Sequence, residues 1–162
     1  MPNPVGTARA KWDEERASAI IDGLKAGEGA LLPILHAIQE AFGFIPEQAE
    51  PLIAERLNVT RAEVHGVVTF YHDFRSEPAG RHVLKLCRAE ACQSMGCDAL
   101  VAHVEDALGI RCGETTADRR LTVEAVYCLG LCAVAPSAMF DGNVVGRLNE
   151  GRLDALVAEA RR

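Results

Sequence analysis

Aromatic side chains and long hydrophobic runs are both scarce in this sequence. Aromatic residues make up only 5% of the 162 residues, whereas hydrophobic residues of all kinds make up 49%. We therefore expect a packed core built mainly from Leu, Val, Ile and Ala. No hydrophobic run approaches the roughly 18 residues that suggest a membrane-spanning helix, and residues 1–10 lack the apolar core of a signal peptide. These absences predict a protein that is not inserted in a membrane and stays in the reducing cytoplasm.

The sequence also lacks an excess of basic residues. Its 17 Lys and Arg residues are outnumbered by 23 Asp and Glu residues, which gives a formal net charge of −6. A nucleic-acid-binding protein would show a clustered basic surface, and an anionic membrane surface attracts basic segments in the same way. We therefore expect neither kind of partner.

Cysteine is absent from the first half and concentrated in the second. Residues 1–80 contain none, and all six cysteines lie at positions 87, 92, 97, 112, 128 and 132. In a reducing compartment, cysteines more often bind metals or do redox chemistry than form structural disulfides. The turn-forming residues 76–80 separate the halves, so we predict two domains, 1–78 and 79–162.

The first half shows hydrophobic residues at helical spacing. This pattern predicts helices over residues 12–26, 31–42, 46–57 and 60–71. Gly43 is a stop signal for the second of them, and Thr60 and Glu63 have the spacing of a capping box that begins the fourth. The first domain is therefore expected to be a helical bundle.

The second half alternates strand and helix patterns. Strands are expected over 81–86 and 121–127, and the latter should bury Ala125 and Tyr127 on one face and expose Thr122 on the other. The remaining elements are a helix over 99–108, a hairpin joining 137–140 to 144–147 through Gly142 and Asn143, and a closing helix over 153–160. The fold class is therefore α/β, with a small sheet covered by helices.

Two cysteine pairs follow the two main predicted strands. Cys87 and Cys92 come after the first strand with four residues between them, and Cys128 and Cys132 come after the second with three. If the two strands are parallel neighbours, both pairs meet at one end of the sheet. Four thiolates at one place suit an iron–sulfur cluster or zinc.

The residues around the pairs favour an anionic iron–sulfur cluster. Small residues let backbone N–H groups approach the sulfurs and stabilise negative charge. These small residues are Ala89, Ala91, Gly130 and Ala133. Arg88 can add a positive charge nearby, and neither loop contains the histidines that a Rieske centre would need.

Other uses of the cysteines stay open. The spacing from Cys92 to Cys97 repeats that from Cys87 to Cys92, so arithmetic alone allows a ligand set that uses Cys97. We nevertheless interpret Cys97 and Cys112 as thiols that bind no metal. A thioredoxin-like thiol enzyme would need a Cys-x-x-Cys motif, which the sequence lacks. A structural zinc protein that acts as a docking module is the alternative without electron transfer.

The motifs of both halves together resemble those of the NuoE-type family, the thioredoxin-like [2Fe–2S] subunit of complex I and its soluble relatives. In the first half the similar segments are 42–47 and 64–71. In the second half they are the two cysteine pairs, residues 113–116 and the dipeptide 135–136. The resemblance implies an N-terminal helical bundle followed by a thioredoxin-like [2Fe–2S] ferredoxin domain.

The resemblance also assigns roles to single residues. It implies that the cluster is bound by Cys87, Cys92, Cys128 and Cys132. It implies further that Pro136 occupies the turn where thioredoxin-like folds often hold a cis proline.

Within the family, residues 87–96 and 141–148 look most like the gamma subunit of soluble NAD-dependent molybdenum formate dehydrogenases. This implies an electron-transfer subunit without a catalytic site of its own, beside a NuoF-like subunit that binds FMN and NAD. The complex would couple formate oxidation to NAD reduction, with further iron–sulfur clusters and a molybdenum cofactor on partner subunits. The alternative is the equivalent subunit of NADH:quinone oxidoreductase (complex I) or of an NAD-linked hydrogenase.

Overall fold

The computed structural model describes residues 11–162, which divide into two compact units between Pro78 and Ala79. The expectation about a signal peptide concerns residues 1–10 and lies outside the described part. The division into domains 1–78 and 79–162 stays a prediction, because the first domain includes residues 1–10. Within residues 11–162, no helix is long and apolar enough to cross a membrane.

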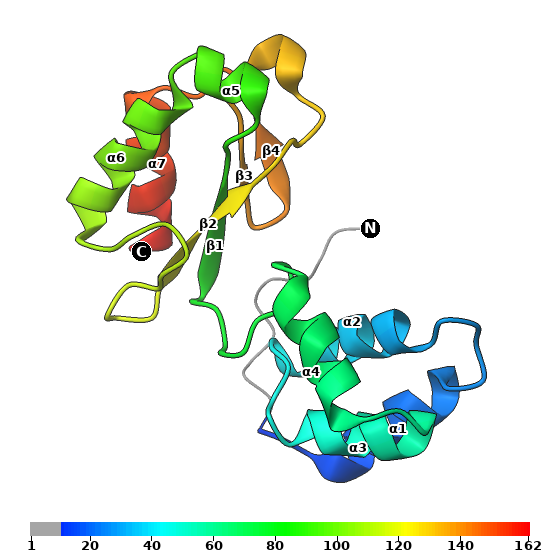
Figure 1. Ribbon diagram of the computed structural model, residues 1–162. Coiled ribbons are helices and arrows are strands. Elements are labelled where there is room, and N and C mark those ends of the chain that lie inside the picture. The colour runs from blue at the N-terminus through cyan, green and yellow to red at the C-terminus, as the bar shows by residue number, and fades with distance from the viewer. Residues whose placement is uncertain (1–10) are drawn as a thin grey trace. The chain divides into compact units, whose positions relative to one another are not determined.

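The first unit is built from four helices, as predicted (Figure 1). They are α1 (Glu14–Leu24), α2 (Leu31–Phe42), α3 (Ala49–Leu57) and α4 (Arg61–Phe70). Asp13 caps α1 by accepting a hydrogen bond from the Arg16 N–H, and Thr60 and Glu63 form the predicted capping box of α4. Gly43 ends α2 with a φ of 85°, a left-handed conformation that glycine adopts without strain.

The helices of the first unit enclose one hydrophobic core. Side chains with no exposed surface come from α1, α2, α3 and α4. They are Ala17, Ile21, Ile34, Leu35, Ile38, Ala49, Ile53 and Val64. Phe42 and Phe74 also belong to this core, and the ring centroids of Trp12 and Phe42 lie 5.2 Å apart. The core is therefore mainly aliphatic, as the composition predicted.

The second unit contains a four-stranded sheet with the strand order β2-β1-β3-β4. The strands are β1 (His82–Cys87), β2 (Leu121–Val126), β3 (Ala138–Phe140) and β4 (Asn143–Val145). β1 and β2 are parallel neighbours, whereas β3 pairs antiparallel with β1 and with β4. The predicted hairpin is thus confirmed, but its positive φ angles fall at Asp141 and Gly142 rather than at Asn143.

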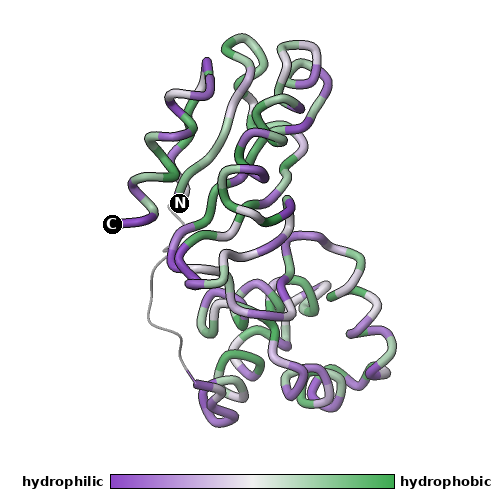
Figure 2. The backbone as a smooth tube through the Cα atoms, turned by 90° about the vertical axis from the view of Figure 1, so that its left-hand side faces the viewer, coloured by the Kyte–Doolittle hydropathy of each residue, from purple (hydrophilic) through white to green (hydrophobic). Residues whose placement is uncertain are grey.

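The helices of the second unit are α5 (Glu90–Ser94), α6 (Cys97–Leu108), the 3₁₀ helix η1 (Cys132–Val134) and α7 (Glu150–Ala160). α5 and η1 lie in the two cysteine loops, beyond the ends of β1 and β2 (Figure 1). α6 packs on β1 and on α7, and Figure 2 shows hydrophilic and hydrophobic residues alternating along the C-terminal helix. This pattern gives α7 one face for the core, where Leu153 and Ala160 are buried.

Strand β2 differs from the sequence prediction. Thr122 is only 4% exposed, whereas Tyr127 is 72% exposed. Thr122 tolerates burial because its hydroxyl accepts a hydrogen bond from the Gly80 N–H at 2.6 Å and contacts the Thr115 hydroxyl at 2.7 Å. Tyr127 is exposed because β2 ends one residue earlier. Ala125, also predicted to be buried, is exposed on this edge strand.

Candidate metal centre

The two cysteine pairs lie at the same end of the sheet because β1 and β2 run parallel (Figure 1). Cys87 is the last residue of β1, and its register partner is Val126, the last residue of β2. The Arg88 N–H extends this pairing by donating to the Val126 carbonyl at 2.8 Å. Cys128 follows only two residues after Val126. The predicted meeting of the two pairs at one sheet end is therefore confirmed.

The first pair is buried. Cys87 and Cys92 are each 2% exposed. Cys92 lies in α5, a short helix that the sequence patterns did not predict. The Cys92 N–H donates to the Ala89 carbonyl at 2.9 Å, and the Gln93 side chain donates to the Arg88 carbonyl at 3.1 Å. These local bonds fix the turn that brings Cys92 back toward Cys87.

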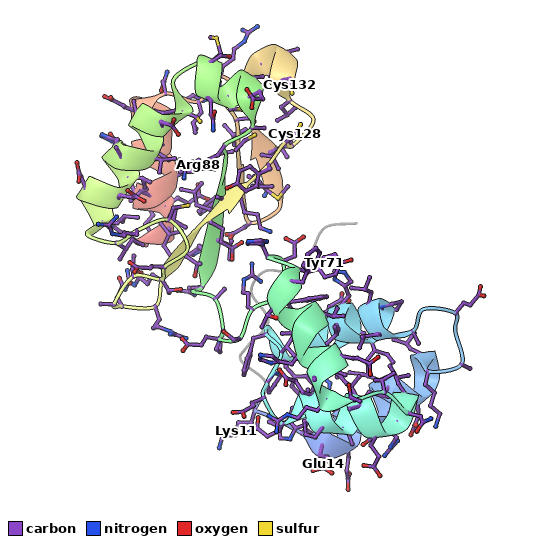
Figure 3. The ribbon with its side chains drawn as sticks, in the orientation of Figure 1. Lys11, Glu14, Tyr71, Arg88, Cys128 and Cys132 are labelled. Carbon is purple, nitrogen blue, oxygen red and sulfur yellow. The ribbon has the colours of Figure 1, made fainter. Side chains whose placement is uncertain are left out.

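The second pair is exposed, and its two sulfurs lie close together (Figure 3). The Sγ atoms of Cys128 and Cys132 are 3.7 Å apart. Two thiolates bound tetrahedrally at about 2.3 Å, the usual zinc–thiolate length, lie about 3.8 Å apart. Positive φ angles at Cys128 and Gly130 curl the loop, and the Gly130 N–H lies 3.4 Å from Cys128 Sγ. The loop thus already has the spacing that one metal ion requires.

Hydrogen bonds from both loops stabilise a thiolate at Cys87. Burial opposes ionisation of this thiol, but hydrogen bonds outweigh burial and lower its pKa. The donors are the backbone N–H groups of Ala89, Cys128 and Leu129, together with the Cys92 side chain. Two of these donors belong to the second loop, and Leu129 of that loop packs against the buried cysteines, so Cys87 lies beside both loops.

The other cysteines of the two pairs raise the pKa of the Cys132 thiol. Its pKa is raised first by the hydrogen bond to Cys128 and the charge of that group, then by burial and by the charges of Cys92 and Cys87. A thiolate at this position is therefore repelled by the other three sulfurs. Bound cations relieve such repulsion, because a metal ion stabilises the deprotonated thiols that coordinate it.

The remaining cysteines occupy two different environments. Cys97 is 3% exposed and packs with Cys87 and Cys92, so it lies beside the candidate centre, although we interpret it as a thiol that binds no metal. Its pKa is raised by burial first and then by the charge of Asp98. The pKa of Cys112 is also raised by burial, and the nearby charges are those of Arg88, Glu105 and Glu124 rather than of other sulfurs.

Three residues near the cysteines have roles that the structure clarifies. Arg88 carries the predicted positive charge, but its guanidinium pairs with the Asp98 carboxylate at 3.2 Å. Sequence patterns missed Ser137, a buried residue whose hydroxyl lies 3.6 Å from Cys92 Sγ. They also missed the exposed Tyr127 beside Cys128, since strand alternation placed it in the core.

The peptide bond between Ala135 and Pro136 is cis, which confirms the expectation from the resemblance.

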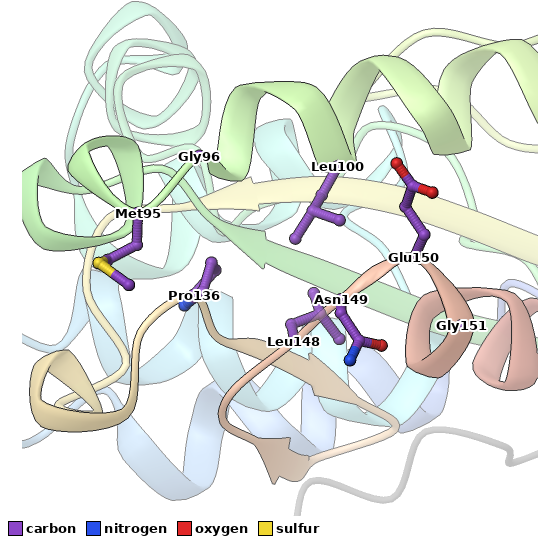
Figure 4. Close-up of a pocket in the computed structure, with 8 residues that line it drawn as sticks. All are labelled: Met95, Gly96, Leu100, Pro136, Leu148, Asn149, Glu150 and Gly151. Atoms are coloured by element: carbon purple, nitrogen blue, oxygen red, sulfur yellow. The ribbon is translucent and has the colours of Figure 1, made fainter.

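A pocket of about 560 Å³ lies at the beginning of α7 (Figure 4). Its lining combines apolar side chains with residues at the ends of α6 and α7. They are Met95, Gly96, Leu100, Pro136, Leu148, Asn149, Glu150 and Gly151. None of these described lining residues is a cysteine, and Glu150 is the one charged side chain among them. The pocket is therefore distinct from the thiol cluster.

A small α/β unit with two cysteine pairs at the carboxyl ends of parallel strands has the arrangement of a protein that binds a metal centre through thiolates. Residues 17–161 match the family model described as thioredoxin-like [2Fe–2S] ferredoxin. The chain belongs to this family, and a [2Fe–2S] cluster is its cofactor. The α/β fold class and the NuoE-type resemblance are thereby confirmed.

Similar proteins come from hydrogenases and from NADH-quinone oxidoreductases. The chain is 34% identical over 139 residues to the NADP-reducing hydrogenase subunit HndA of Solidesulfovibrio fructosivorans, covering 86% of this chain and 81% of that one. It is 40% identical over 132 residues to a subunit of the NADH-quinone oxidoreductase of Rhizobium meliloti (strain 1021), covering 82% and 79%.

A solved structure shows the same fold inside a larger chain. The crystal structure of an air-oxidized NAD⁺-reducing [NiFe]-hydrogenase aligns with a TM-score of 0.68 and 30% identity over 81% of this chain. This chain spans only 22% of that hydrogenase chain. The protein is therefore an iron–sulfur electron-transfer protein related to subunits of NAD-linked oxidoreductases.

Proposed function

We propose that this chain is an electron-transfer subunit that holds one [2Fe–2S] cluster through Cys87, Cys92, Cys128 and Cys132. The observation that carries the proposal is the parallel pairing of β1 and β2, which ends both strands beside these thiols. When bound, the cluster accepts and donates one electron at a time. The residues of the chain hold the cluster and control its contact with solvent, and no catalytic site is needed.

The arrangement of the thiols suits two irons better than one metal ion. A [2Fe–2S] cluster takes two protein thiolates on each iron, and the chain offers its cysteines as one buried and one exposed pair. Backbone N–H groups directed at Cys87 and Cys128 would stabilise the anionic cluster.

Cys97 is the competing ligand for the buried side. It is the first residue of α6, and its Sγ faces the Asp98 carboxylate at 4.0 Å. A carboxylate beside a sulfur opposes the thiolate that a metal requires. Cys87 has instead the backbone N–H groups of both loops around it. This difference supports Cys87 and Cys92 as the buried pair.

Single replacements by serine test the ligand set. We expect Cys87→Ser, Cys92→Ser, Cys128→Ser and Cys132→Ser to weaken or abolish the cluster, and the matched control Cys112→Ser to retain it. Iron, acid-labile sulfide and zinc per chain, with visible and low-temperature EPR spectra, measure the outcome in anaerobically purified protein. Loss of the cluster in Cys97→Ser with retention in Cys87→Ser would overturn the assignment. Colourless protein with zinc would favour a docking module.

The proposed partner is a NuoF-like subunit that binds FMN and NAD, in a cytoplasmic complex. Relatives named as subunits of an NADP-reducing hydrogenase and of NADH-quinone oxidoreductase support a partner of this kind. Residues 87–96 and 141–148 support the finer assignment to a formate dehydrogenase with a molybdenum-containing catalytic subunit. Tyr127, 72% exposed beside Cys128, offers a contact for the partner at the exposed pair.

The parent complex is identified by the electron donor that reduces the cluster. The complex is purified anaerobically from its source through a tag on this chain, and formate, NADH and H₂ are added separately. We expect formate and NADH each to produce the reduced [2Fe–2S] EPR signal, with a flavin subunit and molybdenum present. Reduction by H₂ but not formate would assign the chain to a hydrogenase. Reduction by NADH alone, with quinone reduction, would assign it to complex I.

A further inference from the structure

Ser137 is a buried polar residue that contacts both buried cysteines of the proposed site. It is 2% exposed. Its carbonyl accepts a hydrogen bond from the Cys87 N–H at 3.0 Å, and its Oγ lies 3.6 Å from Cys92 Sγ. Ser137 directly precedes β3, which pairs with β1. The sheet therefore holds the hydroxyl beside the sulfur from a segment that carries no ligand.

Metal binding determines which atom donates in this contact. As free groups, either the Ser137 hydroxyl or the Cys92 thiol could be the donor. A thiolate bound to iron has no proton and can only accept. In the loaded protein the Ser137 hydroxyl is therefore the group able to donate.

We infer that Ser137 donates a hydrogen bond to Cys92 Sγ and thereby raises the reduction potential of the cluster. The inference rests on the proposed function, since it requires Cys92 to be a ligand. It makes Ser137 a residue that adjusts the cluster's affinity for an electron without binding iron itself.

The direction of the effect follows from charge. Reduction adds a negative charge to the cluster and its ligand sulfurs, so a hydrogen bond to a sulfur is stronger in the reduced state. Hydrogen bonds to the sulfurs are among the features that set iron–sulfur potentials. Burial strengthens the contribution of Ser137, because the local dielectric is low and water cannot readily replace the hydroxyl.

Arg88 is the cation beside the same loop, and its effect should be weaker. Its guanidinium pairs with Asp98 at 3.2 Å, and both side chains are more than a third exposed. The opposite charge of Asp98 and the surrounding solvent reduce its field at the sulfurs. A buried neutral hydroxyl in contact with a ligand thus outweighs an exposed and already paired charge.

A redox titration of the full chain tests the inference. Ser137→Ala removes the hydroxyl, and Ser94→Ala is the matched control. Ser94 lies in the same helix as Cys92, but its exposed hydroxyl donates to the Ala91 carbonyl at 3.0 Å. EPR-monitored titration of the anaerobically purified proteins gives the midpoint potentials. We expect Ser137→Ala to disfavour reduction on the order of tenfold, which corresponds to about −59 mV for one electron, and Ser94→Ala to keep the original midpoint.

The isosteric pair Ser137→Thr and Ser137→Val separates the hydroxyl from packing. Thr keeps a donor and Val has the same shape without one, so the Val variant should have the lower midpoint. If Ser137→Ala does not retain its cluster, the difference in midpoint potential between the Thr and Val variants tests the inference instead. A loaded Ser137→Ala protein with an unchanged midpoint, or equal midpoints for Thr and Val, would overturn the inference. Failure of the proposed ligand set would instead show as an intact cluster in Cys92→Ser.

Discussion

The two cysteine loops of the second unit differ in how firmly the fold holds them. The loop after β1 buries Cys87 and Cys92 at 2% exposure each, and a short helix fixes its turn. The loop after β2 leaves Cys128 and Cys132 exposed, next to the exposed ring of Tyr127. In the proposed ligand set, one loop would therefore anchor the cluster in the core, whereas the other would present it to solvent and to a partner.

Thiol alkylation should show the largest difference between the loops. In folded protein freed of iron, we expect iodoacetamide to modify Cys128 and Cys132 on the order of a hundredfold faster than Cys87 and Cys92. A buried thiol reacts only after local opening, and a cost of roughly 3 kcal/mol gives a difference of that size. Mass spectrometry of peptides over a time course measures the rates.

The labelling experiment distinguishes the effect of burial from the effect of thiol pKa, because the two predict opposite orders of reaction for Cys87 and Cys132. The pKa of Cys87 is lowered and that of Cys132 is raised, so thiolate content alone would make Cys87 react first. We expect burial to prevail over that preference. In denaturant the rates should become similar. Faster labelling of Cys87 in the folded chain would contradict the contrast between a buried and an exposed loop.

The exposed loop still depends on one close contact, at Gly146. A Cβ atom placed there would lie 2.5 Å from Val134 Cγ2 and 3.1 Å from the Val134 carbonyl oxygen. Val134 belongs to η1, which begins with Cys132. We expect Gly146→Ala to lower the free energy of unfolding by about 1–3 kcal/mol through overpacking and to speed iron loss to a chelator.

Gly23→Ala is the control for the glycine prediction. Gly23 lies in α1 of the first unit, and an added Cβ would meet nothing within 4 Å. This change should be neutral or stabilise the chain by up to about 1 kcal/mol, because alanine favours helix. Urea unfolding and the rate of iron release measure both variants. Equal iron release from the two would show that Gly146 does not support the exposed loop.

The smallest expected effect concerns the helices behind the site and depends on pH. His103 of α6 contacts the Asp154 carboxylate of α7 at 2.7 Å, and this hydrogen bond is the main cause of its raised pKa. A raised pKa in the folded state means that the stabilisation is complete below about pH 6.5. It is lost as pH rises through the folded-state pKa.

Urea midpoints between roughly pH 5 and pH 9 test this dependence. The original protein should lose a small part of its stability across this range relative to Asp154→Asn, which lacks the carboxylate. The cluster spectrum should stay the same in both proteins, since neither residue is near a cysteine loop. A flat difference between the two proteins would exclude the ion pair as a source of pH dependence.

Local patterns were enough to predict most of the elements. Gly43, the capping box at Thr60 and Glu63, and the turn at Gly142 are short-range signals, because neighbouring backbone groups satisfy them. The cysteine pairs were equally readable, since each follows a strand and has a short spacing. The helices α5 and η1 escaped prediction because they span too few residues for periodicity to appear.

The sequence by itself determined the mainly aliphatic cores, the four helices of the first unit and the placement of each cysteine pair directly after a strand. These properties follow from residue type and from spacing along the chain. Only the tertiary structure decided that one cysteine pair is buried and the other exposed, and that Ser137 lies against Cys92, 45 residues away. Burial and such contacts depend on which strand is at the sheet edge and which segments pair across it. That choice is made by the packing of the whole unit, and no local pattern contains it.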